Sequence, residues 1–538
     1  MTAQAPGAEV AQATEPAGPH LAAVPAAVPL ALLSVVVLCA GAGALATEIS
    51  ASRLLAPYFG NSTVVWANVI GLILIYLSVG YWIGGRVADR HASAAALGRI
   101  LLVAAGAIAV LPLVAHPILR VALDGFDRIQ VGAIVGSFFA TLALFSLPVT
   151  LLGMVSPFAL RLGLTRVDNA GAVSGRLSSL TTVGAIAGTF LPALVLIPAI
   201  GTQRTMIVAA LVVALAATLL LGRRWLLAPL LIAAMLLLPP GAIKPQTGVI
   251  VEQETQYQYA QIARTPDGKI VMRLDDGVAD QSVYRPGATL TGGEWDMPLV
   301  VPPLLDRPLR TALIIGNAGG TTARGLAASY PGVRIDGVEL DPQLTQLARQ
   351  YMGMNDIPGL RVITADGRTY LQTTNERYDL IVVDAYRQAY IPFQLVTQEF
   401  FKLMRDHLEP GGAVVLNVAR VPGDDRLPRA VSGTLATVFP AVYTWHALHF
   451  NDCVIGFDHP LSSAALAVRV GAVPPALQSL VALVRAETEA ITPSASPMTD
   501  DRAPVEWLTD RAVIEHVVQG GRFDEQLLPT RPTPTPPR

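Results

Sequence analysis

The sequence has few charged residues and almost no cysteine. Only 14% of its 538 residues are charged and 52% are hydrophobic, and this composition, with a mean hydropathy of +0.49, is too apolar for an ordinary soluble protein. A formal net charge of −2 gives no reason to expect a nucleic-acid partner. The two cysteines, Cys39 and Cys453, are too few and too far apart to predict a disulfide framework or a metal site.

The apolar residues are concentrated before residue 245. Residues 1–27 are rich in Ala and Pro and lack a basic start, which indicates a disordered leader rather than a signal peptide. Apolar runs that can cross a bilayer then predict a transmembrane domain over residues 28–243, in the plasma (inner) membrane, with the lipid bilayer as a partner. We place seven spans, with an uncertainty of one, at residues 28–46, 64–83, 97–119, 131–152, 177–200, 205–221 and 225–238.

The loops between these spans carry a charge bias. Arginines are about twice as frequent on one side, which the positive-inside rule assigns to the cytoplasm: Arg86, Arg90, Arg99, Arg161, Arg166, Arg176, Arg223 and Arg224. Seven spans would then leave the C-terminal domain outside, although its motifs suit an intracellular nucleotide. One further crossing near Pro157 would restore agreement, and we therefore expect a cytoplasmic catalytic domain.

From residue 244 the sequence has the composition of a soluble protein. Alternating residues at 248–252, 258–264 and 269–274 predict a small antiparallel β domain over residues 244–300. Strands then alternate with helices over residues 301–520, which predicts a doubly wound α/β Rossmann-like domain. Residues 521–538 are a proline-rich tail that we expect to be disordered.

A nucleotide-binding unit is predicted at residues 311–341, TALIIGNAGGTTARGLAASYPGVRIDGVELD. It reads as a strand, a glycine-rich turn, a helix and a second strand. Gly316 and Gly319 allow the backbone to approach a ligand closely, and Glu339 follows the turn by roughly 20 residues, the separation expected of a ribose-binding carboxylate. Asp341 comes directly after it.

Further acids follow other predicted strands of the same sheet. Asp366, with Gly367 beside it, follows one strand, and Asp384 follows the next. One strand-end acid is more often a helix cap than a catalyst. Because the carboxyl ends of parallel strands share one edge, several such acids beside a glycine-rich turn favour a ligand site, with Asp384 deepest.

The order of these motifs over residues 245–460 resembles the spermidine synthase (polyamine aminopropyltransferase) family. The membrane half is similar to the amino-terminal block of fused, transporter-like members, through residues 47–71 and 80–91. The likeness of the C-terminal half lies in LDDG (274–277) with Gln281, IGNAGG (315–320), VELD (338–341), ADG (365–367), YDLIVVDAY (378–386), TQEFF (397–401) and LEPGGAVVLN (408–417).

This resemblance implies a fold and a reaction. The fold would be a polytopic α-helical membrane domain followed by a Rossmann-like domain of S-adenosylmethionine-methyltransferase type, with a small β-hairpin domain before it. The reaction would pass an aminopropyl group from decarboxylated S-adenosylmethionine to a small-molecule amine, without a metal, in a possible homo-oligomer. Asp384 would accept the proton, Glu339 would hold the ribose and Asp366 the adenine. The implied donor site is Gly316, Gly319, Glu339, Asp341, Asp366 and Gly367, and the implied acceptor site is Gln261, Asp276, Gln281, Asp296 and Tyr386.

Three departures from the family pattern affect the acceptor half. Ala318 replaces the usual acid of the glycine-rich turn, Arg387 follows closely after Asp384, and Glu294-Trp295-Asp296 replaces the usual Tyr-His-Glu or Tyr-Gln-Glu. The donor half is kept while the acceptor half is altered. Two other functions therefore stay open: a methyltransferase that uses S-adenosylmethionine itself, and a non-catalytic, transporter-linked nucleotide-binding protein.

Overall fold

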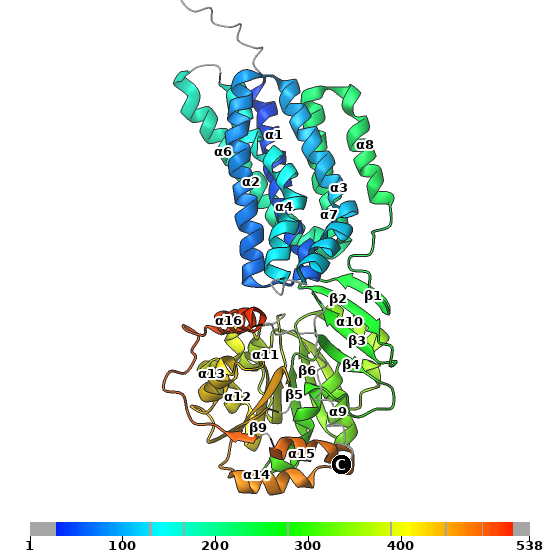
Figure 1. The fold of residues 1–538 in the computed structure, drawn as a ribbon, viewed down its shortest axis with the longest axis vertical. Coiled ribbons are helices and arrows are strands. Elements are labelled where there is room, and N and C mark those ends of the chain that lie inside the picture. The colour runs from blue at the N-terminus through cyan, green and yellow to red at the C-terminus, as the bar shows by residue number, and fades with distance from the viewer. Residues whose placement is uncertain are drawn as a thin grey trace, which may run out of the picture.

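The computed structural model describes residues 28–127, 132–164, 167–276, 279–387, 390–446, 449–486 and 488–519. The predicted leader and tail lie outside these residues. The described chain is elongated, with a helical bundle at one end and a mixed α/β domain at the other (Figure 1). A small β-sheet lies between them on one side of the molecule (Figure 1).

The bundle contains a helix in each of the seven predicted spans. Five stretches within it are long and apolar enough to cross a membrane: Leu30–Phe59, Thr63–Arg90, Ala94–Ala122, Val135–Gly163 and Ala170–Leu221. Its helices are α1 (Leu30–Phe59), α2 (Thr63–Arg90), α3 (Ala94–Asp127), α4 (Gly132–Gly153), α5 (Val155–Gly163), α6 (Ala170–Leu191), α7 (Ile197–Leu221) and α8 (Leu227–Ala234).

The last long stretch consists of two helices, α6 and α7, that run in opposite directions rather than one continuous helix. A Cβ on Gly184 of α6 would lie 2.0 Å from the carbonyl oxygen of Leu38, and a Cβ on Gly43, only five positions along α1, would lie 2.4 Å from Val213 of α7. On one straight helix, positions 184 and 213 would be about 44 Å apart, so the chain must turn back between them. It turns at Gly201, whose φ of +79° breaks the helix.

The expected additional crossing near Pro157 is not present in the described chain. Helix α5 has nine residues, about 14 Å of helix, whereas a span needs about 20 residues. It lies at the end of the bundle where α1 begins, since a Cβ on Gly163 would lie 3.3 Å from Leu33. The α-helix of the seventh predicted span is short, with 3₁₀ turns at Arg223–Trp225 and Met235–Leu237 on either side of α8. The chain nevertheless runs the length of the bundle, because the Gly241 carbonyl accepts from Gln203 at 3.1 Å beside the Gly201 turn.

The small β domain is a four-stranded antiparallel sheet in the order β1-β2-β3-β4. Its strands are β1 (Val249–Glu254), β2 (Tyr259–Arg264), β3 (Ile270–Leu274) and β4 (Asp280–Tyr284). The first three correspond to the predicted strands, and β4 is an addition that packs on the glycine-rich turn.

The α/β domain confirms the predicted Rossmann-like architecture. Its eight strands run in the order β12-β10-β11-β9-β8-β5-β6-β7, and the pairs from β9 to β7 are parallel. The order reverses beside β5, which is the switch point where such sheets bind ligands. The parallel strands are β5 (Thr311–Ile315), β6 (Arg334–Glu339), β7 (Leu360–Thr364), β8 (Tyr378–Val383) and β9 (Leu408–Ala419), and β10 (Ala441–Trp445), β11 (Asn451–Phe457) and β12 (Thr488–Ala490) form the antiparallel edge.

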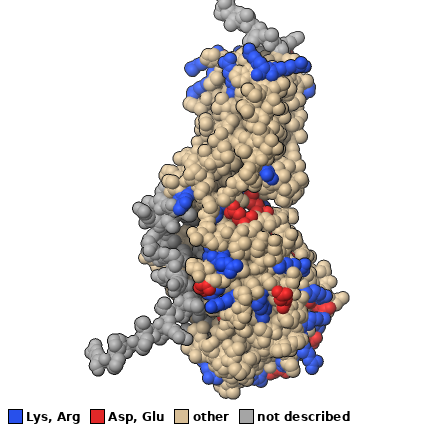
Figure 2. Space-filling view, turned by 90° about the vertical axis from the view of Figure 1, so that its right-hand side faces the viewer, with Lys and Arg blue, Asp and Glu red and all other residues tan. Residues whose placement is uncertain are grey.

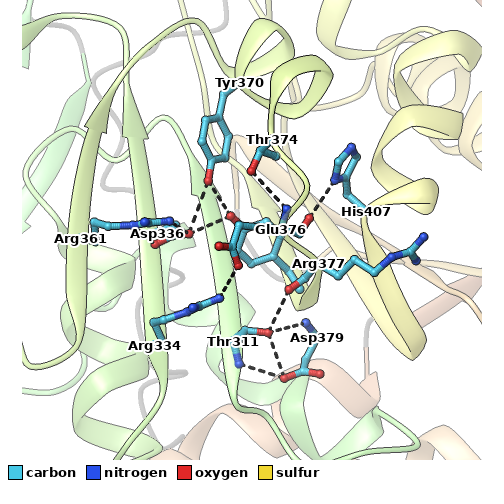
Figure 3. Close-up of polar contacts among 11 residues, drawn as sticks. Thr311, Arg334, Asp336, Arg361, Tyr370, Thr374, Glu376, Arg377, Asp379 and His407 are labelled. Atoms are coloured by element: carbon cyan, nitrogen blue, oxygen red, sulfur yellow. Dashed lines mark hydrogen bonds and ion pairs between the residues drawn. The ribbon is translucent and has the colours of Figure 1, made fainter.

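A polar network ties the amino ends of the parallel strands together (Figure 3). Asp336 of β6 accepts hydrogen bonds from Arg361 Nη2 at 2.7 Å and from the Tyr378 hydroxyl at 2.8 Å. Asp379 of β8 accepts from the backbone N–H groups of Arg310 and Thr311 at 2.7 and 2.9 Å. These carboxylates hold neighbouring strands in place.

Candidate active site

The opposite, carboxyl edge of the sheet carries the predicted ligand site. The glycine-rich turn follows β5, and a Cβ on Gly316, whose φ is +90°, would lie 2.2 Å from the carbonyl oxygen of Asp384. Only glycine allows this contact. Gly319 N–H donates to the Ser282 hydroxyl of β4 at 2.8 Å, so the small β domain closes over the turn. The structure therefore brings the turn and Asp384 together, as predicted.

Glu339 and Asp341 lie beneath this turn. The Glu339 carboxylate accepts from Ala318 N–H at 2.9 Å and from Asp341 N–H at 3.0 Å, and burial raises its pKa. Asp341 caps α10 (Pro342–Tyr351) by accepting from Gln343 N–H at 2.9 Å, and its second oxygen is buried without a hydrogen-bond partner. A ligand hydroxyl that reached these oxygens would meet carboxylates already fixed in position.

Asp366 caps α11 (Gly367–Thr373). Its Oδ1 accepts from the N–H of Thr369 at 2.9 Å and from the Thr369 hydroxyl at 3.0 Å. A Cβ on Gly367 would lie 2.3 Å from Ile315 Cγ2, so the start of this helix packs tightly on the end of β5. Both residues lie at the predicted edge, and Asp366 also serves as a helix cap.

Asp384 lies partly exposed at the end of β8. Its Oδ1 accepts from Asn417 Nδ2 at 2.8 Å, and Asn417 Oδ1 accepts from Asn451 Nδ2 at 2.9 Å. Burial raises the pKa of Asp384 to about 6, and the bond from Asn417 opposes that shift only in part. Asp384 and Asn417 line a small cavity together with Glu294, Trp295, Met297, Pro298, Thr322, Val382, Val415, Asp452 and Cys453.

Glu294 is a second acid in this cavity, and the sequence did not predict it as a site residue. Burial raises its pKa to about 8, and the charge of Asp384 adds to the shift. The predicted residue, Asp296, instead caps its own loop by accepting from Thr291 N–H and Gly292 N–H at 3.0 and 2.7 Å. Both acids lie in the 3₁₀ helix Glu294–Val300, where positions two apart point to different sides.

The other predicted acceptor residues do not line the cavity. Gln261 donates to the Lys244 carbonyl at 2.8 Å, and the Asp276 carbonyl accepts from Lys244. Gln281 lies in β4, beside the serine that binds the turn. The Tyr386 hydroxyl donates to the Asn417 carbonyl at 2.9 Å and accepts from Ala419 N–H at 2.8 Å, which fastens it to β9.

The carboxyl edge faces the helical bundle. Tyr390, six residues after Asp384, donates to Asp510 of α16 (Val505–Val518), and Thr63 at the start of α2 donates to Glu506 of the same helix at 3.1 Å. On the other side, Gln256 N–H in the β1–β2 turn donates to the Gln343 side chain at 3.2 Å, next to Asp341. The site therefore lies between the sheet and the end of the bundle.

Comparison with known proteins agrees with this architecture. Residues 297–447 match the family model of the spermine/spermidine synthase domain. This match agrees with the transferase family that the sequence predicted, and the bundle lies outside it.

Several sequence relatives are named polyamine aminopropyltransferases. A probable polyamine aminopropyl transferase of Bifidobacterium longum is 36% identical over 217 residues, which cover 39% of this chain and 48% of that protein. Polyamine aminopropyltransferase 1 of Streptomyces coelicolor is 26% identical over 424 residues, 72% of this chain and 75% of that protein. This chain spans about half the length of several curated relatives that it matches.

Among solved structures, a probable spermidine synthase from Corynebacterium glutamicum is similar. It is 18% identical with a TM-score of 0.36, and the match covers 47% of this chain and 100% of that one.

Proposed function

We propose that this protein is a membrane-bound aminopropyltransferase that uses decarboxylated S-adenosylmethionine as donor and an amine as acceptor. One observation carries the proposal: residues that suit the donor and residues that suit the amine lie at the same edge of the sheet. Glu339 and the glycine-rich turn suit the nucleoside of the donor, and Asp384 with Glu294 provides two acids with raised pKa values beside them. Cationic amines are the ligands that such acids suit.

Asp384 has the properties that the proton acceptor needs. The acceptor nitrogen would attack the carbon next to the sulfonium, the carbon–sulfur bond would break, and its electron pair would leave on sulfur as a neutral thioether. The new ammonium then loses a proton, and an aspartate with a pKa of about 6 is ionised at neutral pH and able to take it. Asn417 fixes the direction of the carboxylate, which favours a productive arrangement.

Glu294 would help to bind the amine. With a pKa of about 8 it is largely protonated at pH 7, so Asp384 carries most of the charge in the empty site. A cationic acceptor would stabilise the charged form of both acids and release the proton of Glu294. The two carboxyl groups would then titrate as a pair.

The exterior of the bundle supports the membrane part of the proposal. Large apolar side chains are more than half exposed on it, including Leu74, Trp82, Leu113, Phe190 and Leu230. The visible middle of the bundle is nearly free of charged side chains (Figure 2). An apolar belt of this size suits lipid rather than water. The match to the Streptomyces relative also covers more of this chain than the residues after Lys244 provide, so it extends into the bundle.

Product mass would test this function. The intact protein in detergent would be given decarboxylated or ordinary S-adenosylmethionine with a panel of amines. Aminopropyl addition, seen only with the decarboxylated donor, is the expected result. Methyl addition from the ordinary donor would establish the methyltransferase alternative, and donor binding without any product would establish the nucleotide-binding alternative.

A further inference from the structure

The arginines of the bundle gather at one end. Among the described residues of α1 to α8, seven arginines lie at or near the connections between α2 and α3, α4 and α6, and α7 and α8: Arg86, Arg90, Arg99, Arg161, Arg176, Arg223 and Arg224. Figure 2 shows basic side chains at the end of the bundle farthest from the α/β domain.

Packing places these connections at the same end. A Cβ on Gly98 of α3 would lie 2.6 Å from Leu221 at the end of α7, and a Cβ on Gly84 of α2 would lie 2.6 Å from Met154, directly after α4. Arg161 of α5 pairs with Asp89 of α2 at 3.4 Å. The seven arginines therefore belong to one surface of the bundle.

The α/β domain and the small β-sheet are docked on the other end. Thr63 at the start of α2 donates to Glu506 at 3.1 Å, and Thr202, directly after the Gly201 turn, donates from its backbone to Glu254 at 2.6 Å. Arg53, near the end of α1, donates to the carbonyls of Thr255 and Gln256. The described helices contribute only Arg53, Arg120 and Arg204 to this end.

We infer that the catalytic domain lies on the extracytoplasmic side of the membrane, with the carboxyl edge of its sheet facing the bundle. Lys and Arg in short connections remain in the cytoplasm, and the seven arginines are in short connections on the side away from the site. The inference rests on the proposed membrane-bound transferase. It reverses the expectation of a cytoplasmic catalytic domain, because that expectation needed a crossing near Pro157 and α5 is too short to provide one.

This orientation limits the acceptor to amines that can reach the outer side of the membrane. The amine would be one that is present outside the cytoplasm or at the outer surface of the membrane, next to the site between Asp384 and the bundle. An adenosyl-sulfonium made in the cytoplasm would have to cross the bilayer to reach Glu339. The chemistry of the transfer is unchanged.

Cysteine labelling in intact cells tests the orientation. Val468→Cys places a thiol on the 75% exposed position of α14 (Ser463–Arg469), far from the bundle, and His91→Cys places one at the exposed connection between α2 and α3. With a membrane-impermeant maleimide, position 468 should be labelled equally before and after permeabilisation. Position 91 should be labelled only afterwards. The unsubstituted protein is the control, because Cys453 is buried and Cys39 lies within α1.

Each outcome decides the inference. The reverse pattern, or equal labelling of both positions in intact cells, would overturn it. Recovery of the protein in the soluble fraction after alkaline washing would reject the membrane part of the proposed function instead. Product mass measured on the same two variants in detergent tests the transferase separately, since neither residue lines the site.

Discussion

Two aspartates at opposite edges of one sheet differ in what surrounds them. Asp336, at the amino edge, loses charge stabilisation through burial, but Arg361 and Tyr378 more than compensate and hold its pKa below the usual range. Asp384, at the carboxyl edge, has Asn417 as its partner, and burial raises its pKa to about 6. The same kind of side chain therefore holds strands together at one edge and is an acid with a raised pKa at the other.

This difference shows why burial alone does not identify an active site. At the amino edge the carboxylates already have partners, because Asp336 and Asp379 accept hydrogen bonds from groups of the same domain (Figure 3). At the carboxyl edge, the charge of Asp384 adds to the raised pKa of Glu294, and a cationic ligand would favour the ionised form of both acids. Perturbed carboxyl groups in a cavity are typical of functional sites.

Substitution of Asp384 should lower activity but not stability, whereas substitution of Asp336 should lower stability but not activity. Asp384→Asn keeps the shape but removes the proton acceptor, so kcat should fall by about 10²–10⁴ while the unfolding midpoint is unchanged or higher. Asp336→Asn should instead lower the free energy of unfolding by about 1–3 kcal/mol and leave kcat near wild type. Steady-state rates and thermal unfolding measure both, and an active Asp384→Asn variant would contradict the assigned role.

Glu339→Gln should weaken the binding of the donor rather than the binding of the acceptor. The amide has one accepting oxygen where the carboxylate has two, and Ala318 N–H and Asp341 N–H already occupy the carboxylate. We expect donor affinity to fall by about 10- to 100-fold, equal to about 1.4–2.8 kcal/mol. Titration calorimetry would measure it, with Asp336→Asn at the opposite edge of the sheet as the control. Unchanged donor affinity would remove Glu339 from the site.

The pH dependence of activity should follow Asp384. Because the acceptor must be ionised, kcat/KM should rise with pH through about 6. Glu294, with a pKa of about 8, is already neutral where Asp384 titrates, so Glu294→Gln should leave the midpoint of that rise near 6 and increase the KM for the amine. A midpoint that moves far from 6 in this variant would contradict the assignment of the rise to Asp384.

The pH dependence of stability has a definite sign. The pKa values of Glu294 and Asp384 are higher in the folded state, so the folded protein binds more protons than the unfolded chain between about pH 4 and pH 8. Stability should therefore fall as pH rises across this window. Glu294→Gln should reduce the fall by about 1 kcal/mol or more. Unfolding midpoints at a series of pH values would measure it, and an identical slope would contradict the raised pKa.

Tyr386→Phe should have the smallest effect. Its hydroxyl bonds to the backbone of β9, so its loss should cost about 1 kcal/mol of unfolding free energy and leave the KM for the amine unchanged. A large increase in KM would favour the acceptor contact that the sequence predicted. The same pair of measurements separates the two roles.

The sequence predicted the parts of the site that follow from strand order. Glu339 and Asp384 follow strands of one parallel sheet, so their shared edge could be predicted without coordinates. Glu294 could not, because its direction depends on the phase of a 3₁₀ helix that no sequence signal marked. The docking of the α/β domain against the bundle was also unpredictable, since it depends on contacts such as Thr63 with Glu506, far apart in sequence.

A single-turnover reaction with decarboxylated S-adenosylmethionine most directly tests the proposed transfer. Wild-type protein and Asp384→Asn would be mixed with donor and an amine at neutral pH, and the product masses would be compared. The proposed mechanism predicts an amine that has gained an aminopropyl group with wild type and almost none with the variant. Equal product from both proteins, or an amine that has gained only a methyl group from ordinary S-adenosylmethionine, would contradict it.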